Sequence, residues 1–68
     1  MAPKRTHAVG RIVDLADGNA KLETPDGQIV SFRAYGTERA KLIHFGVDKM
    51  AAVELVRDVA LRIVYLDG

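Results

Sequence analysis

Apolar and polar residues alternate along three consecutive stretches between Val9 and Tyr35, and two short polar segments that contain Asp-Gly separate these stretches. Alternation is the pattern of a β-strand with one buried face, because successive side chains point to opposite sides of a sheet. Short segments with Asp-Gly between such stretches are typical of hairpin turns. The pattern therefore predicts three antiparallel strands joined by two tight turns.

The second turn has a composition that sets its geometry, because Pro25 fixes φ and Gly27 accepts a positive φ. A type I turn followed by glycine as a bulge makes a three-residue loop. A two-residue loop would instead place Leu22 opposite Ser31, so the hydrophobic pattern selects the longer loop. The resulting register pairs Thr24 with Gln28, Leu22 with Val30, and Ala20 with Phe32.

The first turn is predicted to be a two-residue type I′ turn over Asp17-Gly18, since both residues tolerate a positive φ. This turn pairs Leu15 with Ala20, Val13 with Leu22, and Asp14 with Lys21 as a cross-strand ion pair. The two turns then give one apolar face, which consists of Val9, Val13, Leu15, Ala20, Leu22, Val30 and Phe32. The reverse face carries Ile12, Asp14, Lys21, Glu23, Ile29, Ser31, Arg33 and Tyr35. Gly10, inside the first strand, predicts a bend.

Two later stretches fit both a helix and a strand. Residues 38–45 are either a short helix capped by Thr37 or a strand from residue 40, and Gly46 ends either element. Residues 49–63 gather their apolar side chains on one side at helical spacing, with Asp48 as a helix cap. Residues 59–66 alternate and are β-branched, which favours a final strand. We expect that strand, preceded by a short helix or loop over 49–56.

These elements predict a mainly β fold, a small five-stranded barrel of the OB or SH3 kind with a short helix or loop before the last strand. The alternative is a three-stranded meander followed by a C-terminal helix, in the α+β class. Residues 1–7 carry basic charges without apolar partners, so we expect a flexible basic arm there. Residues 8–68 should form a single domain.

The small size of the chain bounds its stability, because 68 residues bury only about 60% of the unfolded surface. Cysteine is absent, which excludes disulfides and thiolate metal sites. We therefore expect a homodimer, formed through the face that carries Ile12 and Ile29. No apolar run reaches the roughly 20 residues of a membrane helix, so we expect a cytoplasmic protein that binds no membrane.

The formal net charge is only +1, so nucleic-acid binding would need a local patch. Basic and aromatic residues do interleave near residues 31–35, as in barrels that bind single strands by stacking and phosphate contacts. The predicted nucleic-acid interface consists of Lys4, Arg5, Arg11, Arg33, Tyr35, Arg39 and Lys41. The alternative is a protein partner, bound through a sheet edge or through the apolar residues of 42–56.

Catalytic chemistry finds little support in the sequence. The hydroxyl residues Thr24, Ser31 and Thr37 lack a glycine-flanked elbow with a base. The two histidines, His7 and His44, have no cysteine with which to complete a zinc site. We therefore expect a binding module without catalytic residues, metal or cofactor, and not an enzyme.

Two segments resemble the KfrB-type small domains of conjugative plasmids. The closing residues Arg62-Ile63-Val64-Tyr65-Leu66-Asp67-Gly68, preceded by Ala52-Val53-Glu54, resemble that family's last strand, and Gly10-Arg11-Ile12-Val13 resembles its first. The family's usual glycine before the last strand is replaced by Arg57-Asp58. The resemblance implies a small barrel, an accessory protein of a mobile element in plasmid maintenance or transfer. The segment Ile43-His44-Phe45 also resembles a strand of cold-shock domains that touches single-stranded nucleic acid.

Overall fold

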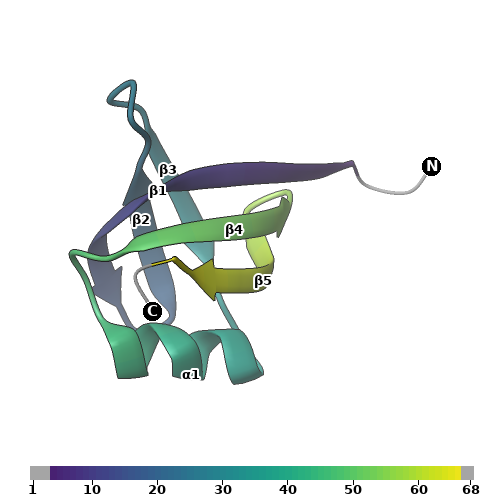
Figure 1. The fold of residues 1–68 in the computed structure, drawn as a ribbon. Helices are drawn as coiled ribbons and strands as arrows, with labels where there is room; N and C mark the ends of the chain where they lie inside the picture. Colours follow the sequence, from purple (N-terminus) through teal and green to yellow (C-terminus); the bar gives the residue numbers. More distant parts are fainter. Residues whose placement is uncertain (1–3, 67–68) are drawn as a thin grey trace.

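A computed structural model describes residues 4–66 as a five-stranded sheet that closes on itself above one helix (Figure 1). The elements are β1 Arg5–Ala16, β2 Asn19–Glu23, β3 Ile29–Arg33, α1 Gly36–Phe45, β4 Met50–Val56 and β5 Val59–Tyr65. The order around the ring is β1, β2, β3, β5, β4, and β4 pairs with β1. The predicted mainly β class is confirmed, and the helix between β3 and β4 with the parallel β3–β5 pair is the OB-type arrangement.

The predicted hairpin between β2 and β3 is confirmed residue by residue. Ala20 pairs with Phe32 and Leu22 with Val30. The backbone N–H of Thr24 donates to the Gln28 carbonyl at 2.9 Å, and Gly27 has φ 88°. Turn chemistry and the hydrophobic pattern together therefore predicted this register.

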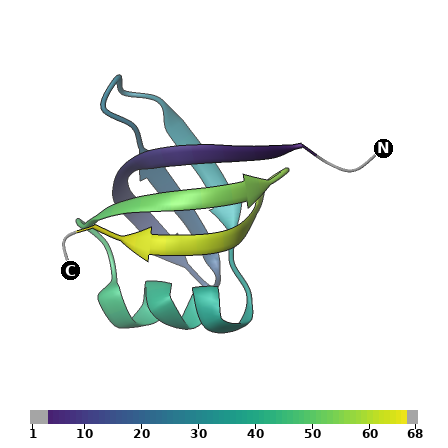
Figure 2. The same ribbon diagram turned by 45° about the vertical axis from the view of Figure 1, so that its right-hand side comes forward.

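Strand β1 is long and bent, and it pairs with two other strands. Residues 5–11 pair with β4, whereas residues 11–16 pair with β2, so β1 curves around one side of the ring (Figure 2). A Cβ on Gly10 would lie 2.1 Å from the carbonyl oxygen of Glu23. Only glycine lets the two backbones approach this closely, and the predicted bend at Gly10 has this physical cause.

The predicted pairing of Val13 with Leu22 is wrong, because a β-bulge falls at Val13. Ile12 pairs with Leu22, while Asp14 still pairs with Lys21 and Leu15 with Ala20. The backbone N–H of Ile12 donates to the Lys49 carbonyl at 2.9 Å, and its carbonyl accepts from Asp48 at 2.7 Å. These bonds to the segment before β4 hold Ile12 in the inward position that Val13 was expected to occupy.

The bulge exchanges the faces of the N-terminal half of β1. Ile12 is fully buried, while Val9 and Val13 are exposed. The homodimer surface expected from Ile12 and Ile29 therefore loses Ile12, and Ile29 alone remains exposed. The buried core consists of Ile12, Ala20, Leu22, Phe32, Ala34, Leu42, Ala51, Val53, Leu55, Ala60 and Ile63.

The helix α1 lies across the lower end of the ring and buries Leu42 in the core (Figure 1). Thr37 does not cap it: the N-cap residue is Tyr35, no side chain bonds the cap, and Thr37 lies inside the helix. Gly46 ends the helix as expected, with φ 77° and its N–H donated to the Leu42 carbonyl at 2.8 Å.

The helix or loop expected over 49–56 is wrong, as is the alternative C-terminal helix, because this stretch is strand β4. The final strand expected over 59–66 is confirmed as β5. Ala51, Val53 and Leu55 point inward, but the outward positions of β4 are also largely apolar, which masked the alternation. The turn between β4 and β5 places Arg57 at φ 57°, a conformation that glycine adopts more easily. Because no glycine stands there, no local signal in the sequence indicated a turn.

Three residues of the predicted flexible arm, Arg5, Thr6 and His7, are instead part of β1 and pair with β4. Lys4 precedes the strand, and the rest of the predicted arm lies outside the described residues, as do the last two residues of the KfrB-like segment. Within residues 4–66, no helix is long and apolar enough to cross a membrane.

Candidate nucleic-acid interface

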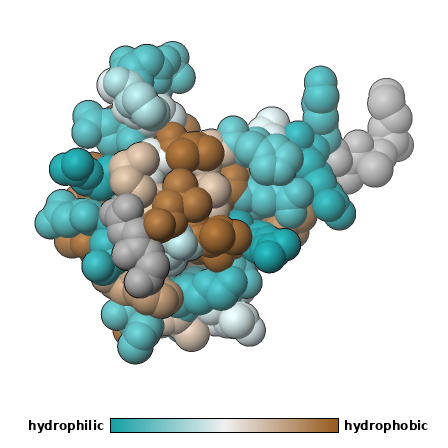
Figure 3. All heavy atoms as spheres, in the orientation of Figure 1, coloured by the Kyte–Doolittle hydropathy of each residue, from teal (hydrophilic) through white to brown (hydrophobic). Residues whose placement is uncertain are grey.

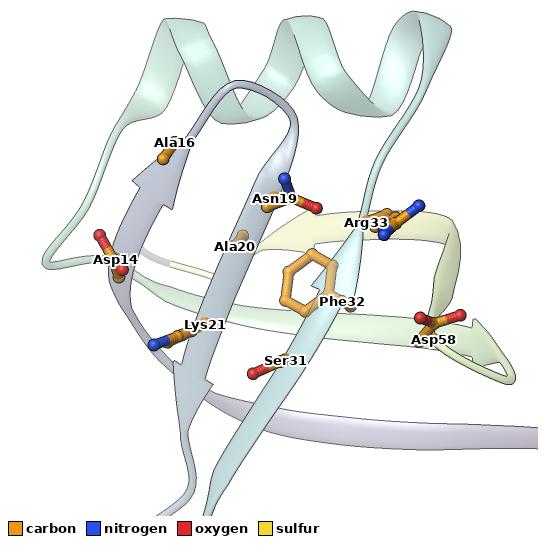
Figure 4. A pocket seen from close by; sticks show the side chains of 9 residues that line it. All are labelled: Asp14, Ala16, Asn19, Ala20, Lys21, Ser31, Phe32, Arg33 and Asp58. Atoms are coloured by element: carbon orange, nitrogen blue, oxygen red, sulfur yellow. The ribbon is translucent and has the colours of Figure 1, made fainter.

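Two adjoining hollows mark the outer face of β2 and β3. The first, of about 270 Å³, is lined by Asp14, Ala16, Asn19, Ala20, Lys21, Ser31, Phe32, Arg33 and Asp58 (Figure 4). The second, of about 410 Å³, is lined by Asp17, Gly18, Asn19, Arg33, Ala34, Tyr35 and Arg39. Because Asn19 and Arg33 line both, the hollows form one surface. OB barrels use this face, together with the β1–β2 and β4–β5 loops, to bind ligands.

The first hollow has balanced charge. Lys21 and Arg33 face it from β2 and β3, and Asp14 and Asp58 face it from β1 and the β4–β5 turn (Figure 4). Asp14 accepts a hydrogen bond from the Leu15 N–H at 2.9 Å. In residues 4–66 neither Lys21 nor Arg33 forms an ion pair. Asp14 and Lys21 are paired across the strands as predicted, but their side chains do not form the expected ion pair. Both cations are available to a ligand.

The second hollow brings together three of the predicted residues, Arg33, Tyr35 and Arg39. The Tyr35 side chain is exposed, at 60%. The guanidinium of Arg39 lies 3.7 Å from the carboxylate of Asp17, and both groups are largely in solvent. An exposed pair at this distance contributes little, so Arg39 can exchange Asp17 for another anion at small cost.

The local fold explains why these three residues meet. The N–H of Ala34 donates to the Gly18 carbonyl at 2.8 Å, which holds the β1–β2 turn against the end of β3. The chain then enters α1, which places Arg39 over that same turn. A strand end, a turn and a helix therefore converge at one point.

Lys41 does not join this cluster, because it is bound within the fold. Its Nζ donates to the Ile63 carbonyl at 3.0 Å and lies 3.1 Å from the Glu38 carboxylate. That carboxylate also accepts the N–H of Ile63 at 2.7 Å. Glu38 and Lys41 together satisfy both backbone groups of one β5 residue.

Arg5 and Arg11 lie on a different side of the ring, on the part of β1 that pairs with β4, and Lys4 directly precedes them. Arg5 is 3.7 Å from the Glu54 carboxylate, and His7 is 3.4 Å from it. The seven predicted residues are therefore divided among three places on the molecule.

Sequence reasoning did not select Asn19, Lys21 or Asp58, which also line the hollows. For Lys21 a signal existed, because the predicted register places it beside Ser31 on the outer face. For Asp58 the sequence held no such signal, since no turn was predicted at residues 57–58.

Two observations on titratable groups bear on metal binding and on acid–base chemistry. Within residues 4–66, no three histidine or acidic side chains are grouped to hold a metal ion. Burial raises the pKa of Tyr65, whose hydroxyl donates to the Gly46 carbonyl at 3.3 Å, but this residue lies at the junction of α1 and β5. Neither observation places reactive chemistry in the two hollows.

The chain can also be compared with known proteins. Comparison with protein-family models, curated proteins and solved structures gives no significant match. The assignment of a function therefore rests on the geometry of this site.

Proposed function

We propose that this protein is a non-enzymatic binding module whose β2–β3 face contacts single-stranded nucleic acid. The convergence of Arg33, Tyr35 and Arg39 on one hollow carries the proposal. Two cations beside an exposed aromatic ring are the elements with which OB barrels hold a single strand.

In this proposal, Arg33 and Arg39 contact phosphates and a base stacks on the Tyr35 ring. Lys21 extends the cationic track across β2. Asp14, Asp17 and Asp58 lie among these cations, so the site does not attract polyanions by net charge. We expect modest affinity with little sequence preference, because stacking is available to every base.

Binding should weaken with salt in proportion to the phosphates contacted. Two or three contacts predict a slope of log K against log salt of about −1.4 to −2.1 for a single strand. Fluorescence anisotropy with a labelled oligonucleotide measures this slope between about 50 and about 200 mM salt. Absence of binding at the lower salt would contradict the proposal.

The variants Arg33→Ala and Tyr35→Ala test the cluster directly. Loss of one stacked base should cost about 1–3 kcal/mol, which is roughly 5-fold to more than 100-fold in affinity. Tyr35→Phe should retain most of the binding, because the ring is kept. Arg11→Ala is the matched control, since Arg11 is a predicted contact that the fold places away from the hollows. Equal losses from Arg11→Ala and Arg33→Ala would contradict this site.

The resemblance to KfrB-type domains would assign such binding to a cytoplasmic accessory protein of a plasmid. Genes for plasmid transfer or maintenance beside this one would support that role.

A protein-binding role is the second candidate, and exposed apolar side chains on the outer face of β1, β4 and β5 favour it.

A further inference from the structure

The outer face of β1, β4 and β5 carries an apolar row that crosses all three strands. Val9 pairs with Ala52, and Ala52 pairs with Val64, so the three side chains lie side by side. Val9 is 45% exposed and Val64 is 40% exposed. Figure 3 shows hydrophobic side chains gathered over this part of the molecule.

Cationic residues flank the apolar row on both sides. On one side of the row, Glu54 lies two residues from Ala52, and Arg62 lies two residues from Val64. On the other side, Arg11 lies two residues from Val9. This offset is about 7 Å. In the described part of the chain Arg11 and Arg62 form no ion pair, whereas Glu54 is contacted by Arg5 and His7. The row therefore lies between two available positive charges.

The row continues as a groove toward the helix. One hollow of about 370 Å³ is lined by His7, Val9, Ala52, Val53, Glu54, Arg62 and Val64. A second of about 340 Å³ is lined by Lys41, Phe45, Arg62, Ile63, Val64 and Tyr65. Arg62 and Val64 line both hollows, which makes them continuous from β1 to the end of α1. The ring of Phe45 packs on Tyr65 at a centroid distance of 4.6 Å and forms the far wall.

We propose that this groove docks an amphipathic α-helix of a partner protein, with acidic residues on both flanks of its apolar stripe. The groove crosses three strands about 4.8 Å apart and reaches a helix beyond them, a span of roughly 20 Å. Three to four helical turns have that length. Apolar residues at helical spacing would fill the row, and their acidic neighbours would meet Arg11 and Arg62.

The charges of the face distinguish this occupant from a second copy of the chain. Arg5, Arg11 and Arg62 share the face with one carboxylate, Glu54, which Arg5 and His7 already contact. A facing copy would bring these cations together, and like charges at an interface are unfavourable. The aliphatic centre of the row likewise offers nothing on which a nucleic acid base can stack.

The test uses the full chain and a fluorescent synthetic peptide of about 14 residues, with leucines on one helical stripe and glutamates on both flanks. Wild-type protein should bind it saturably, while a scrambled peptide of the same composition should not. Val64→Asp and Arg62→Glu should each weaken binding about tenfold or more. Arg57→Glu is the matched control, because it reverses an exposed charge at the β4–β5 turn and this residue lines neither hollow of the groove.

A charge exchange separates docking from a defect in folding. The double variant Arg11→Glu with Arg62→Glu should lose the glutamate-flanked peptide and gain a lysine-flanked one. Arg33→Ala should leave peptide binding unchanged, since Arg33 lies on the β2–β3 face.

Four results would overturn the proposal. The first is equal binding of the scrambled peptide, and the second is equal losses from Arg62→Glu and Arg57→Glu. The third is binding to anionic phosphatidylglycerol vesicles without binding to the peptide, which would indicate a lipid surface. The fourth is a dimer in sedimentation that Val64→Asp dissociates, which would make a second copy the occupant.

Discussion

The ring is closed at two places that differ in what holds them together. Between β1 and β4 the pairing is continuous from Arg5 to Arg11. Between β3 and β5 one pair, Arg33 with Val59, is joined by a hydrogen bond from the Arg33 N–H to the Asp58 carbonyl at 2.7 Å. One junction is a backbone ladder and the other is a single point of contact.

Past that point, side chains of α1 take the place of a neighbouring strand. Glu38 accepts the Ile63 N–H, and Lys41 donates to the Ile63 carbonyl. An open strand edge is a site for unwanted pairing, and covering it is one way in which proteins avoid this. The β1–β4 ladder is therefore sensitive to the space between backbones, whereas the β3–β5 junction depends on two polar side chains, Glu38 and Lys41.

Gly10→Ala should disrupt the backbone ladder of β1 and have the largest effect. The new Cβ would collide with the carbonyl of Glu23, and neither backbone can move without disrupting the ladder. We expect a loss of about 3 kcal/mol in the free energy of unfolding, the upper end for overpacking. Urea denaturation followed by circular dichroism measures it.

The control for this change is Gly27→Ala, at the tip of the β2–β3 hairpin. Its Cβ would meet nothing within 4 Å, but its φ of 88° is strained for alanine. The expected cost is about 1 kcal/mol. Equal losses at the two glycines would show that crowding at Gly10 is not decisive.

Glu38→Ala should break the side-chain junction, with an intermediate effect. It removes the acceptor of the Ile63 N–H and the partner of Lys41. We expect a loss of about 1.5–3 kcal/mol, the range for hydrogen bonds to charged groups. Hydrogen exchange adds a local measurement, in which the Ile63 amide should lose protection before the paired amides of β5.

Thr37→Ala serves as the control for Glu38→Ala, because Thr37 is an exposed neighbour in the same helix. It should change stability by less than about 0.5 kcal/mol. If Glu38→Ala left the exchange of Ile63 unchanged, the helix would not be protecting this edge.

Arg57→Gly should strengthen the β4–β5 turn beside the β3–β5 junction, and its effect is the smallest. Arg57 has φ 57°, where a side chain is strained by about 1–2 kcal/mol. Glycine removes this strain but adds about 0.5–1 kcal/mol of entropy cost on folding. We expect a net gain of between zero and about 1.5 kcal/mol in thermal or urea denaturation. Arg57→Ala, which keeps the strain, should show no gain.

The candidate interface was only partly predictable from the sequence. Arg33 and Tyr35 are close in the chain, and their alternation is visible as a pattern. Arg39 joins them because α1 starts beside the β1–β2 turn, which no local pattern records. Lys41 is a basic residue close to Arg39 in the sequence, so the two could not be told apart before the structure was known. Lys41 is held away from the cluster by the Ile63 carbonyl, which lies 22 residues away in the chain.

Local signals in the sequence were sufficient to predict the two hairpins that join β1, β2 and β3 near their turns. Proline and glycine restrict φ locally, so Pro25-Asp26-Gly27 and Asp17-Gly18 carry their register without help from distant residues. Long-range contacts determine which residues of β1 before the bulge face the core, and they make residues 50–56 a strand. Ile12 is buried because residues 48–49 bond its backbone, and β4 is extended because β1 and β5 supply partners on both sides. Both outcomes depend on hydrogen bonds between residues far apart in the chain, and a β-strand acquires such partners only when the whole sheet assembles.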